Sequence, residues 1–157
     1  MEILIRQASL EDTNNINHLL RLSKGHWGYS EEFLDSFMKG FSITAQYIQK
    51  YDIRLFYIDN IMVGFFNFII NKDNILELDN FFLHPDYIGR GIGRKLWDSC
   101  CQIAKKLGNT EFVIWSDPNA EPFYLKMGCE KIGVRASPTM PNRYPPVLRF
   151  KQQENGK

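Results

Sequence analysis

A glycine-rich segment between a predicted strand and a predicted helix constrains this chain more than any other feature. It reads Gly89-Arg-Gly-Ile-Gly-Arg94, directly after an apolar strand at 75–83 and directly before an amphipathic helix at about 92–107. Glycines let the backbone approach a ligand closely, and the unpaired amides and positive dipole at a helix start attract phosphate. The segment therefore predicts a strand–loop–helix unit with a pyrophosphate site at its junction.

Two common nucleotide-binding patterns do not fit this segment. A Walker loop needs G-x-x-x-x-G-K-S/T, which is absent. A dinucleotide-binding fold needs G-x-G-x-x-G after the first strand, whereas here the spacing is G-x-G-x-G and the predicted strand is the fourth.

The rest of the chain alternates between the two types of secondary structure. Ser9 with Asp12, and Ser30 further on, are typical helix starts, and Asn60 marks the turn of a hairpin. The expected strands cover 2–8, 54–59, 62–70, 75–83, 111–115, 129–134 and 147–150, and the expected helices cover 10–23, a segment from Ser30, 92–107 and a short segment from Asp117. With 157 residues, 44% of them hydrophobic, we expect one α/β domain over 1–157.

Composition excludes several classes of function. A net charge of +1 argues against a dedicated nucleic-acid binder. The longest apolar run, 61–70, is about half the roughly 20 residues that cross a bilayer, and the amino terminus has no signal-like pattern. The three cysteines and three histidines lack the spacing of a metal site or a disulfide framework. We therefore expect a cytoplasmic protein that binds neither membrane nor metal.

Two motifs, in order, resemble the GNAT superfamily of acetyl-coenzyme A-dependent N-acetyltransferases. The first is a strand, a His-Pro turn and Q/R-x-x-G-x-G/A before a helix, which here is Leu76–Leu83, His84-Pro85 and Ile88-x-x-Gly91-x-Gly93. The second, an Asn followed by Phe-Tyr and a Gly that ends a helix, is found within 119–128. Ile88 departs from the Gln or Arg of the family; because that position acts mainly through its backbone amide, we expect the pyrophosphate contact to survive.

The resemblance implies a fold and a bound co-substrate. The fold is a central mixed, mostly antiparallel sheet flanked by helices and splayed between its fourth and fifth strands. Acetyl-CoA would extend the sheet at the end of the fourth strand, with its phosphates on the glycine loop beside two arginines. The implied contacts are Phe81, Phe82, Leu83, Gly89, Arg90, Gly91, Ile92, Gly93, Arg94, Asn119, Phe123 and Tyr124.

The resemblance also assigns the proton transfers. Tyr124 would protonate the departing thiolate, because a phenol is protonated at neutral pH. An ammonium has no lone pair, so a base is required, and Glu77 and Asp79 share one face of the strand that precedes the glycine loop. Either could be the base, or both could bind a cationic acceptor, or both could be solvated acids. His84 is assigned a structural role in its turn.

The acceptor pocket of the family is built from the loop between the first two helices and from late loops. Trp27 and Tyr29 could form an aromatic wall for an amine, and Arg143 could contact an anionic group of the acceptor.

The leading hypothesis is acetyl transfer to a primary amine of a small molecule by direct attack in a ternary complex. The alternatives are a protein or peptide N-acetyltransferase and a non-catalytic CoA-binding sensor. Either a monomer or a homodimer fits the sequence.

Overall fold

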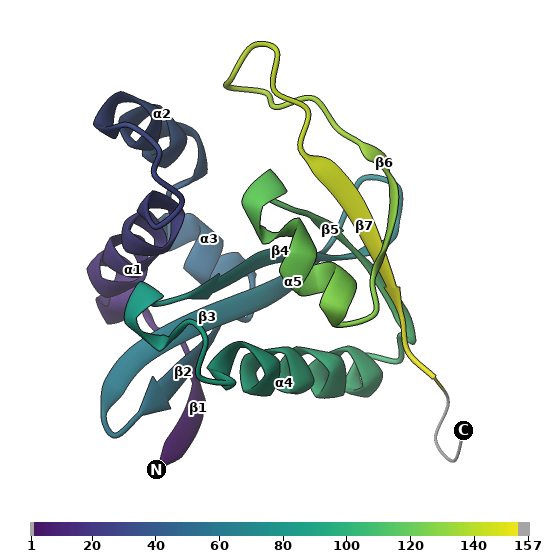
Figure 1. The fold of residues 1–157 in the computed structure, drawn as a ribbon. Coiled ribbons are helices and arrows are strands. Elements are labelled where there is room, and N and C mark those ends of the chain that lie inside the picture. Colours follow the sequence, from purple (N-terminus) through teal and green to yellow (C-terminus); the bar gives the residue numbers. More distant parts are fainter. Residues whose placement is uncertain (1, 154–157) are drawn as a thin grey trace. The chain divides into compact units, whose positions relative to one another are not determined.

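The structure is a computed structural model that describes residues 2–153 (Figure 1). Within this range the chain order is β1 (Ile3–Gln7), a 3-10 helix (Leu10–Asp12), α1 (Thr13–Gly25), α2 (Glu31–Phe41), α3 (Ala45–Lys50), β2 (Arg54–Ile58), β3 (Ile61–Ile70), β4 (Leu76–Leu83), a 3-10 helix (Pro85–Tyr87), α4 (Ile92–Lys106), β5 (Glu111–Trp115), a 3-10 helix (Pro118–Ala120), α5 (Glu121–Lys126), β6 (Glu130–Val134) and β7 (Pro146–Lys151).

The strands form one seven-stranded sheet in the order β1-β2-β3-β4-β5-β7-β6. β4 and β5 run parallel, with Glu77 opposite Val113 and Leu78 opposite Ile114. The pairs β1–β2, β2–β3, β5–β7 and β6–β7 are antiparallel. The predicted mixed, mostly antiparallel sheet flanked by helices is confirmed, and the divergence of β4 and β5 beyond their ladder stays a prediction.

Two compact units are distinguished along the chain. The first unit comprises Met1–Asn67 and Asn80–Leu96, and the second comprises Phe68–Asp79 and Trp97–Lys157. Strands β3 and β4 and helix α4 each contribute residues to both units. That residues 1–157 act as one domain stays a prediction.

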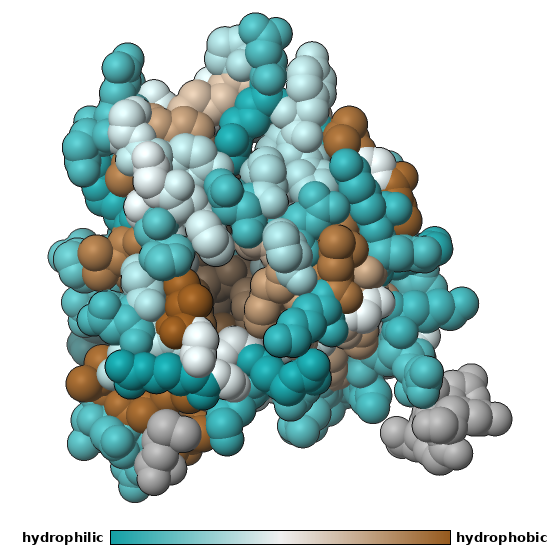
Figure 2. All heavy atoms as spheres, in the orientation of Figure 1, coloured by the Kyte–Doolittle hydropathy of each residue, from teal (hydrophilic) through white to brown (hydrophobic). Residues whose placement is uncertain are grey.

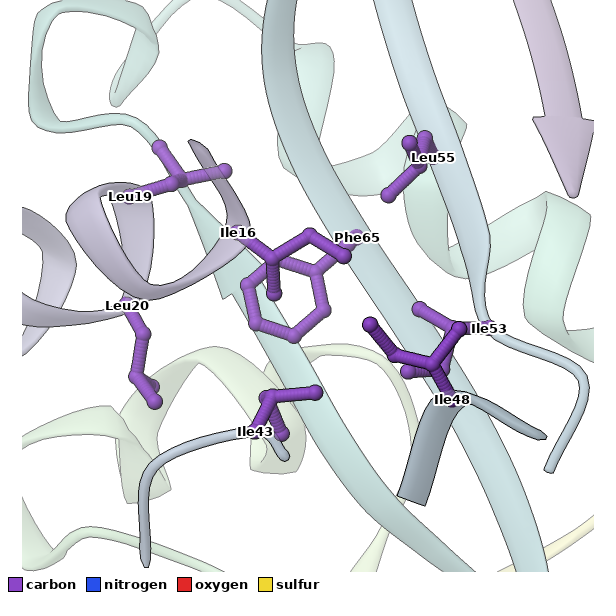
Figure 3. Close-up of a cluster of buried hydrophobic side chains, with 8 residues drawn as sticks. All are labelled: Ile16, Leu19, Leu20, Ile43, Ile48, Ile53, Leu55 and Phe65. Carbon is purple, nitrogen blue, oxygen red and sulfur yellow. The ribbon is translucent and has the colours of Figure 1, made fainter. Parts of the chain in front are cut away.

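One buried cluster of the first unit is aliphatic apart from a single ring (Figure 3). In α1, the core residues recur at the spacing of one helix face, so that this face is buried. The side chains point toward one another from α1, α3, β2, β3 and the segments next to them; they are Ile16, Leu19, Leu20, Ile43, Ile48, Ile53, Leu55 and Phe65.

An ion pair links β1 to the 3-10 helix at Leu10–Asp12. Arg6 donates to Asp12 twice, from Nη1 to Oδ2 at 2.9 Å and from Nη2 to Oδ1 at 2.8 Å. The backbone amide of Ser9 also donates to Asp12 Oδ2, at 2.8 Å, which completes the predicted helix start. The hydrogen bonds from Arg6 lower the pKa of Asp12 to about 2, against the opposing effect of burial.

Local signals explain most element boundaries. Asp59 and Asn60 have φ of 48° and 71°, the left-handed conformations that a two-residue hairpin turn requires, so the predicted hairpin is confirmed. The sequence did not predict α3, which has only six residues and is therefore too short for a helical period; its cap is the Thr44 hydroxyl, which accepts from the Tyr47 amide at 3.1 Å.

The second unit is built around aromatic rings. The Trp97 ring lies 5.0 Å from that of Phe150, 5.6 Å from that of Phe112 and 5.8 Å from that of Tyr124, mostly edge to face. These contacts join α4, β5, β7 and α5, with Trp97 touching a ring from each of the other three elements.

Exposed apolar groups are separated by hydrophilic side chains on the face shown in Figure 2. The edge strand β1 contributes Ile3, Leu4 and Ile5 to the exposed apolar surface. Among residues 2–153, every helix is too short or too polar to cross a membrane.

Candidate active site

The glycine loop of the first unit needs glycine for its backbone conformation. Gly89 and Gly91 have φ of +81° and +78°, in the left-handed region, and a Cβ at either position would meet no atom within 4 Å. Open space above a left-handed backbone suits close approach by a ligand. Ile92, 2% exposed, then anchors the first turn of α4 in the unit. The loop therefore ends at the start of a 15-residue helix, as predicted, and such a start can bind a phosphate.

His84 holds the turn that carries β4 into this loop. Its amide donates to the Val63 carbonyl at 2.7 Å, and its Nδ1 accepts from the Asp86 amide at 3.1 Å. These bonds give His84 the structural role that was expected. The Ile88 amide donates to the Pro85 carbonyl at 3.2 Å, so this amide is used within the turn.

The two arginines of the loop are exposed, and one of them lies on a ring. Arg90 has its guanidinium carbon 5.2 Å from the centre of the Tyr87 ring. Arg94 follows in the first turn of α4, on its exposed side. Both cations are thus available to an anion that approaches from solvent.

The loop between α1 and α2 has one exposed and one stacked ring. Trp27 is 39% exposed and lies edge-on to His26, whereas Tyr29 stacks on Phe33 at 4.0 Å. Lys24 lies beneath, 7% exposed, with its Nζ 5.6 Å from the centre of the Tyr29 ring. Sequence reasoning missed this lysine, although its position four residues after Leu20 places it on the buried face of α1.

Glu77 of β4 is the most enclosed acid of the second unit, at 4% exposure. Its Oε1 accepts from Asn71 Nδ2 at 3.1 Å and from Arg135 Nη2 at 3.3 Å. The Arg135 guanidinium lies 5.0 Å from the Trp115 ring centre, and the indole Nε1 donates to the Arg135 carbonyl at 3.2 Å. Arg135 thus forms an ion pair with Glu77, a contact that no sequence signal indicated.

Asp79, the other predicted base, is exposed. Glu77 and Asp79 are two residues apart in β4, yet only Glu77 is enclosed. The burial of the two carboxylates therefore differs, although their spacing placed both on one face of the strand.

Asp117 brings together two residues that the sequence proposed separately. Its Oδ1 accepts from both the backbone amide and Nδ2 of Asn119, at 2.8 and 3.0 Å. Its Oδ2 pairs with Arg143 Nη2 at 3.4 Å. The segment before α5 is thus tied to the late loop by one carboxylate.

Tyr124 of α5 is 5% exposed and packs against Trp97 and Phe123. Burial, followed by the nearby thiols of Cys100 and Cys129 and by Asp117, raises the pKa of Tyr124 well above its ordinary value. The phenol is therefore protonated across the physiological range.

The part of the chain at 2–153 contains no group of three His, Cys, Asp or Glu side chains that could hold a metal ion.

Comparisons with known proteins identify the family and the fold. The model of the Acetyltransferase (GNAT) domain family matches residues 10–137. An uncharacterized N-acetyltransferase of Methanocaldococcus jannaschii is 34% identical over 65 residues; the matched region is 40% of this chain and spans only 29% of that protein's length.

Solved structures share the fold. The PaiA N-acetyltransferase of Thermoplasma acidophilum, solved in complex with coenzyme A, has a TM-score of 0.74 at 24% identity, over 96% of this chain and 99% of that one. A GCN5-related N-acetyltransferase of Rhodopseudomonas palustris has a TM-score of 0.79 at 17% identity, over 96% of each chain. Because the family model covers well over half of the sequence, this chain belongs to the GNAT acetyltransferase family.

Proposed function

We propose that this protein transfers the acetyl group of acetyl-CoA to a primary amine of a small molecule, by direct attack in a ternary complex. The observation that carries the proposal is the glycine loop, whose left-handed Gly89 and Gly91 lie open in front of the start of α4. Family membership and the coenzyme A complex of the Thermoplasma relative support the same co-substrate.

The proposed contacts to acetyl-CoA follow from this loop. Residues 89–94 would bind the pyrophosphate through backbone amides, with Arg90 and Arg94 pairing with its charges. The backbone of 81–83 would bond the pantetheine arm, and Asn119 and Phe123 would contact it. When bound, acetyl-CoA supplies an acetyl group activated as a thioester.

Two proton transfers complete the proposed reaction. The amine nitrogen forms a bond to the acetyl carbon while the carbon–sulfur bond breaks and its electron pair goes to sulfur. Tyr124 Oη gives its proton to that thiolate and regains one from solvent. Glu77, through water, takes the proton that the amine must lose; Asp79 is the alternate base.

The acceptor is proposed to lie against aromatic side chains. Trp27 and Tyr29 would desolvate the amine or stack on its cationic form. Arg143, which pairs with Asp117, is proposed to meet an anionic group of the acceptor.

A thiol-release assay against n-butylamine, L-lysine and 2-phenylethylamine tests the proposal. We expect thiol release that depends on both acetyl-CoA and amine. Release with a lysine-containing peptide but with none of the free amines would favour a protein acetyltransferase. Acetyl-CoA binding by calorimetry without release would favour a sensor.

We also propose a cytoplasmic protein that acts as a monomer or a homodimer. Light scattering of the purified chain separates these two states.

A further inference from the structure

Three polar side chains form a buried hydrogen-bonded cluster in the first unit. They are Tyr47 of α3, Asn67 of β3 and Asn80 of β4, and the two asparagines are 1% and 9% exposed. Asn67 Nδ2 donates to Tyr47 Oη at 2.8 Å, and Asn80 Nδ2 donates to Tyr47 Oη at 3.1 Å and to Asn67 Oδ1 at 2.8 Å. Both amides are thereby held in one orientation.

These hydrogen bonds use both donors of the Asn80 side chain and leave its acceptor, Oδ1, unused. Its NH2 group has two hydrogens, and both are directed at partners within the cluster. Its Oδ1 accepts no hydrogen bond from the described residues. Since no fully buried side-chain N or O atom among residues 2–153 lacks a partner, this oxygen is not fully buried. A carboxamide that is nine-tenths buried therefore presents only an acceptor.

The place of Asn80 in the fold points to the substrate that would use this oxygen. Asn80 and Phe82 share one face of β4, and Phe82 packs against the core formed with α1 and α3. The loop that carries Trp27 and Tyr29 connects α1 to α2, and Phe37 of α2 packs against the same core. Asn80 also directly precedes the backbone that is proposed to bond the pantetheine arm.

We propose that Asn80 Oδ1 accepts a hydrogen bond from an N–H of the acceptor amine and thereby selects and orients it. This inference rests on the proposed function. The cluster of Tyr47 and Asn67 holds the carboxamide in place, so the amine meets a fixed oxygen and little side-chain entropy is lost when it binds. Asn80 therefore binds the amine, and other groups transfer the protons.

Two substitutions at Asn80 separate binding from structure. Asn80→Leu removes the oxygen, and we expect it to lower kcat/KM for the best of n-butylamine, L-lysine and 2-phenylethylamine by about 10- to 100-fold, mainly through KM. Asn80→Asp keeps an oxygen there but loses the donors to Tyr47 and Asn67, so it should retain clearly more activity than Asn80→Leu without reaching that of the wild type. Acetyl-CoA affinity, measured by calorimetry, should not change in either variant. Asn80→Ala replaces Asn80→Leu if the latter does not fold.

Asn17→Leu is the matched control. Asn17 is a partly buried amide of the same unit whose oxygen accepts from the Ile43 amide at 2.7 Å, so it presents no free acceptor. The Asn17→Leu variant should be less stable than the wild type, and its KM for the amine should not change.

The outcomes are distinguishable. Equal losses in Asn80→Asp and Asn80→Leu would reduce Asn80 to a structural role, since neither side chain can donate to Tyr47 and Asn67. Unchanged kinetics in Asn80→Leu would also overturn the inference while leaving the proposed function intact. If the wild type releases thiol with none of the amines, the proposed function and this inference fall together.

Discussion

Tyr124 is the residue on which the proposed chemistry depends most. Tyr124→Phe keeps the ring that packs against Trp97 and removes only the hydroxyl. We expect turnover to fall about 10²-fold or more, the effect typical of losing a general acid, with acetyl-CoA affinity unchanged. Steady-state kinetics and calorimetry measure the two quantities. Unaltered turnover would show that the phenol only packs.

Glu77→Gln tests the base. The substitution preserves size but removes the charge that pairs with Arg135. The rate should fall most at low pH and recover partly at high pH, where unprotonated amine becomes abundant without help. A pH–rate profile distinguishes the cases. A uniform loss at every pH would make Glu77 a positioning residue, and a normal profile would move the role to Asp79 or solvent.

Because the thiols of the three cysteines have raised pKa values, we predict that no covalent acetyl-enzyme forms. Burial raises the pKa of Cys101 to about 11 and that of Cys129 to about 12, and it raises the pKa of the fully buried Cys100 thiol as well. Thiolate is therefore scarce at neutral pH. Iodoacetamide at pH 7 should leave activity intact, and initial-rate lines for the two substrates should intersect. Parallel lines with rapid inactivation would indicate a cysteine intermediate.

Among the elements, the loop between β4 and α4 can be tested by substituting one of its glycines. Gly91→Val forces a β-branched residue into the left-handed region and should abolish acetyl-CoA binding while leaving the fold largely intact. Gly108→Ala is the matched control, because Gly108 has φ +83° and equally open surroundings after α4. It should cost about 1 kcal/mol of stability and leave affinity unchanged. Calorimetry that gives equal affinities for Gly91→Val and the wild type would contradict the phosphate site.

The junction of β1 with the first helical segment predicts a pH dependence of stability. Because the pKa of Asp12 is lowered to about 2 in the folded state, its contribution is full above the unfolded value near 4 and is lost as pH falls through about 2. Asp12→Asn should lower the free energy of unfolding at pH 7 by about 1–3 kcal/mol, since Arg6 loses a charged partner. Urea titrations at pH 7 and pH 2 should show this difference shrinking. A difference independent of pH would assign the effect to the cap alone.

Sequence reasoning succeeded where the determining residues are neighbours. The Asp59–Asn60 turn and the glycine loop follow from local backbone preferences, so both are placed correctly. The pair of Glu77 and Arg135 joins residues 58 positions apart, and no local pattern encodes such a contact. The cluster around Asn80 likewise depends on strand pairing, which brings Asn67 within hydrogen-bond distance.

At the scale of the whole molecule, the family and the fold could be predicted because two motifs lie in the expected order along most of the chain. The acceptor could not be predicted, because the side chains proposed to bind it, such as Trp27 and Asn80, lie on separate elements, and no motif describes their combination. A net charge of +1 adds no preference for a charged partner.

The most direct test of acetyl transfer is mass spectrometry of the acceptor amines after incubation with acetyl-CoA and the wild-type protein. We expect an N-acetylated amine formed in equal amount to free CoA, with much less product from Tyr124→Phe and none from Gly91→Val. Free CoA without an acetylated amine, or acetylated amine formed equally by all three proteins, would contradict this expectation.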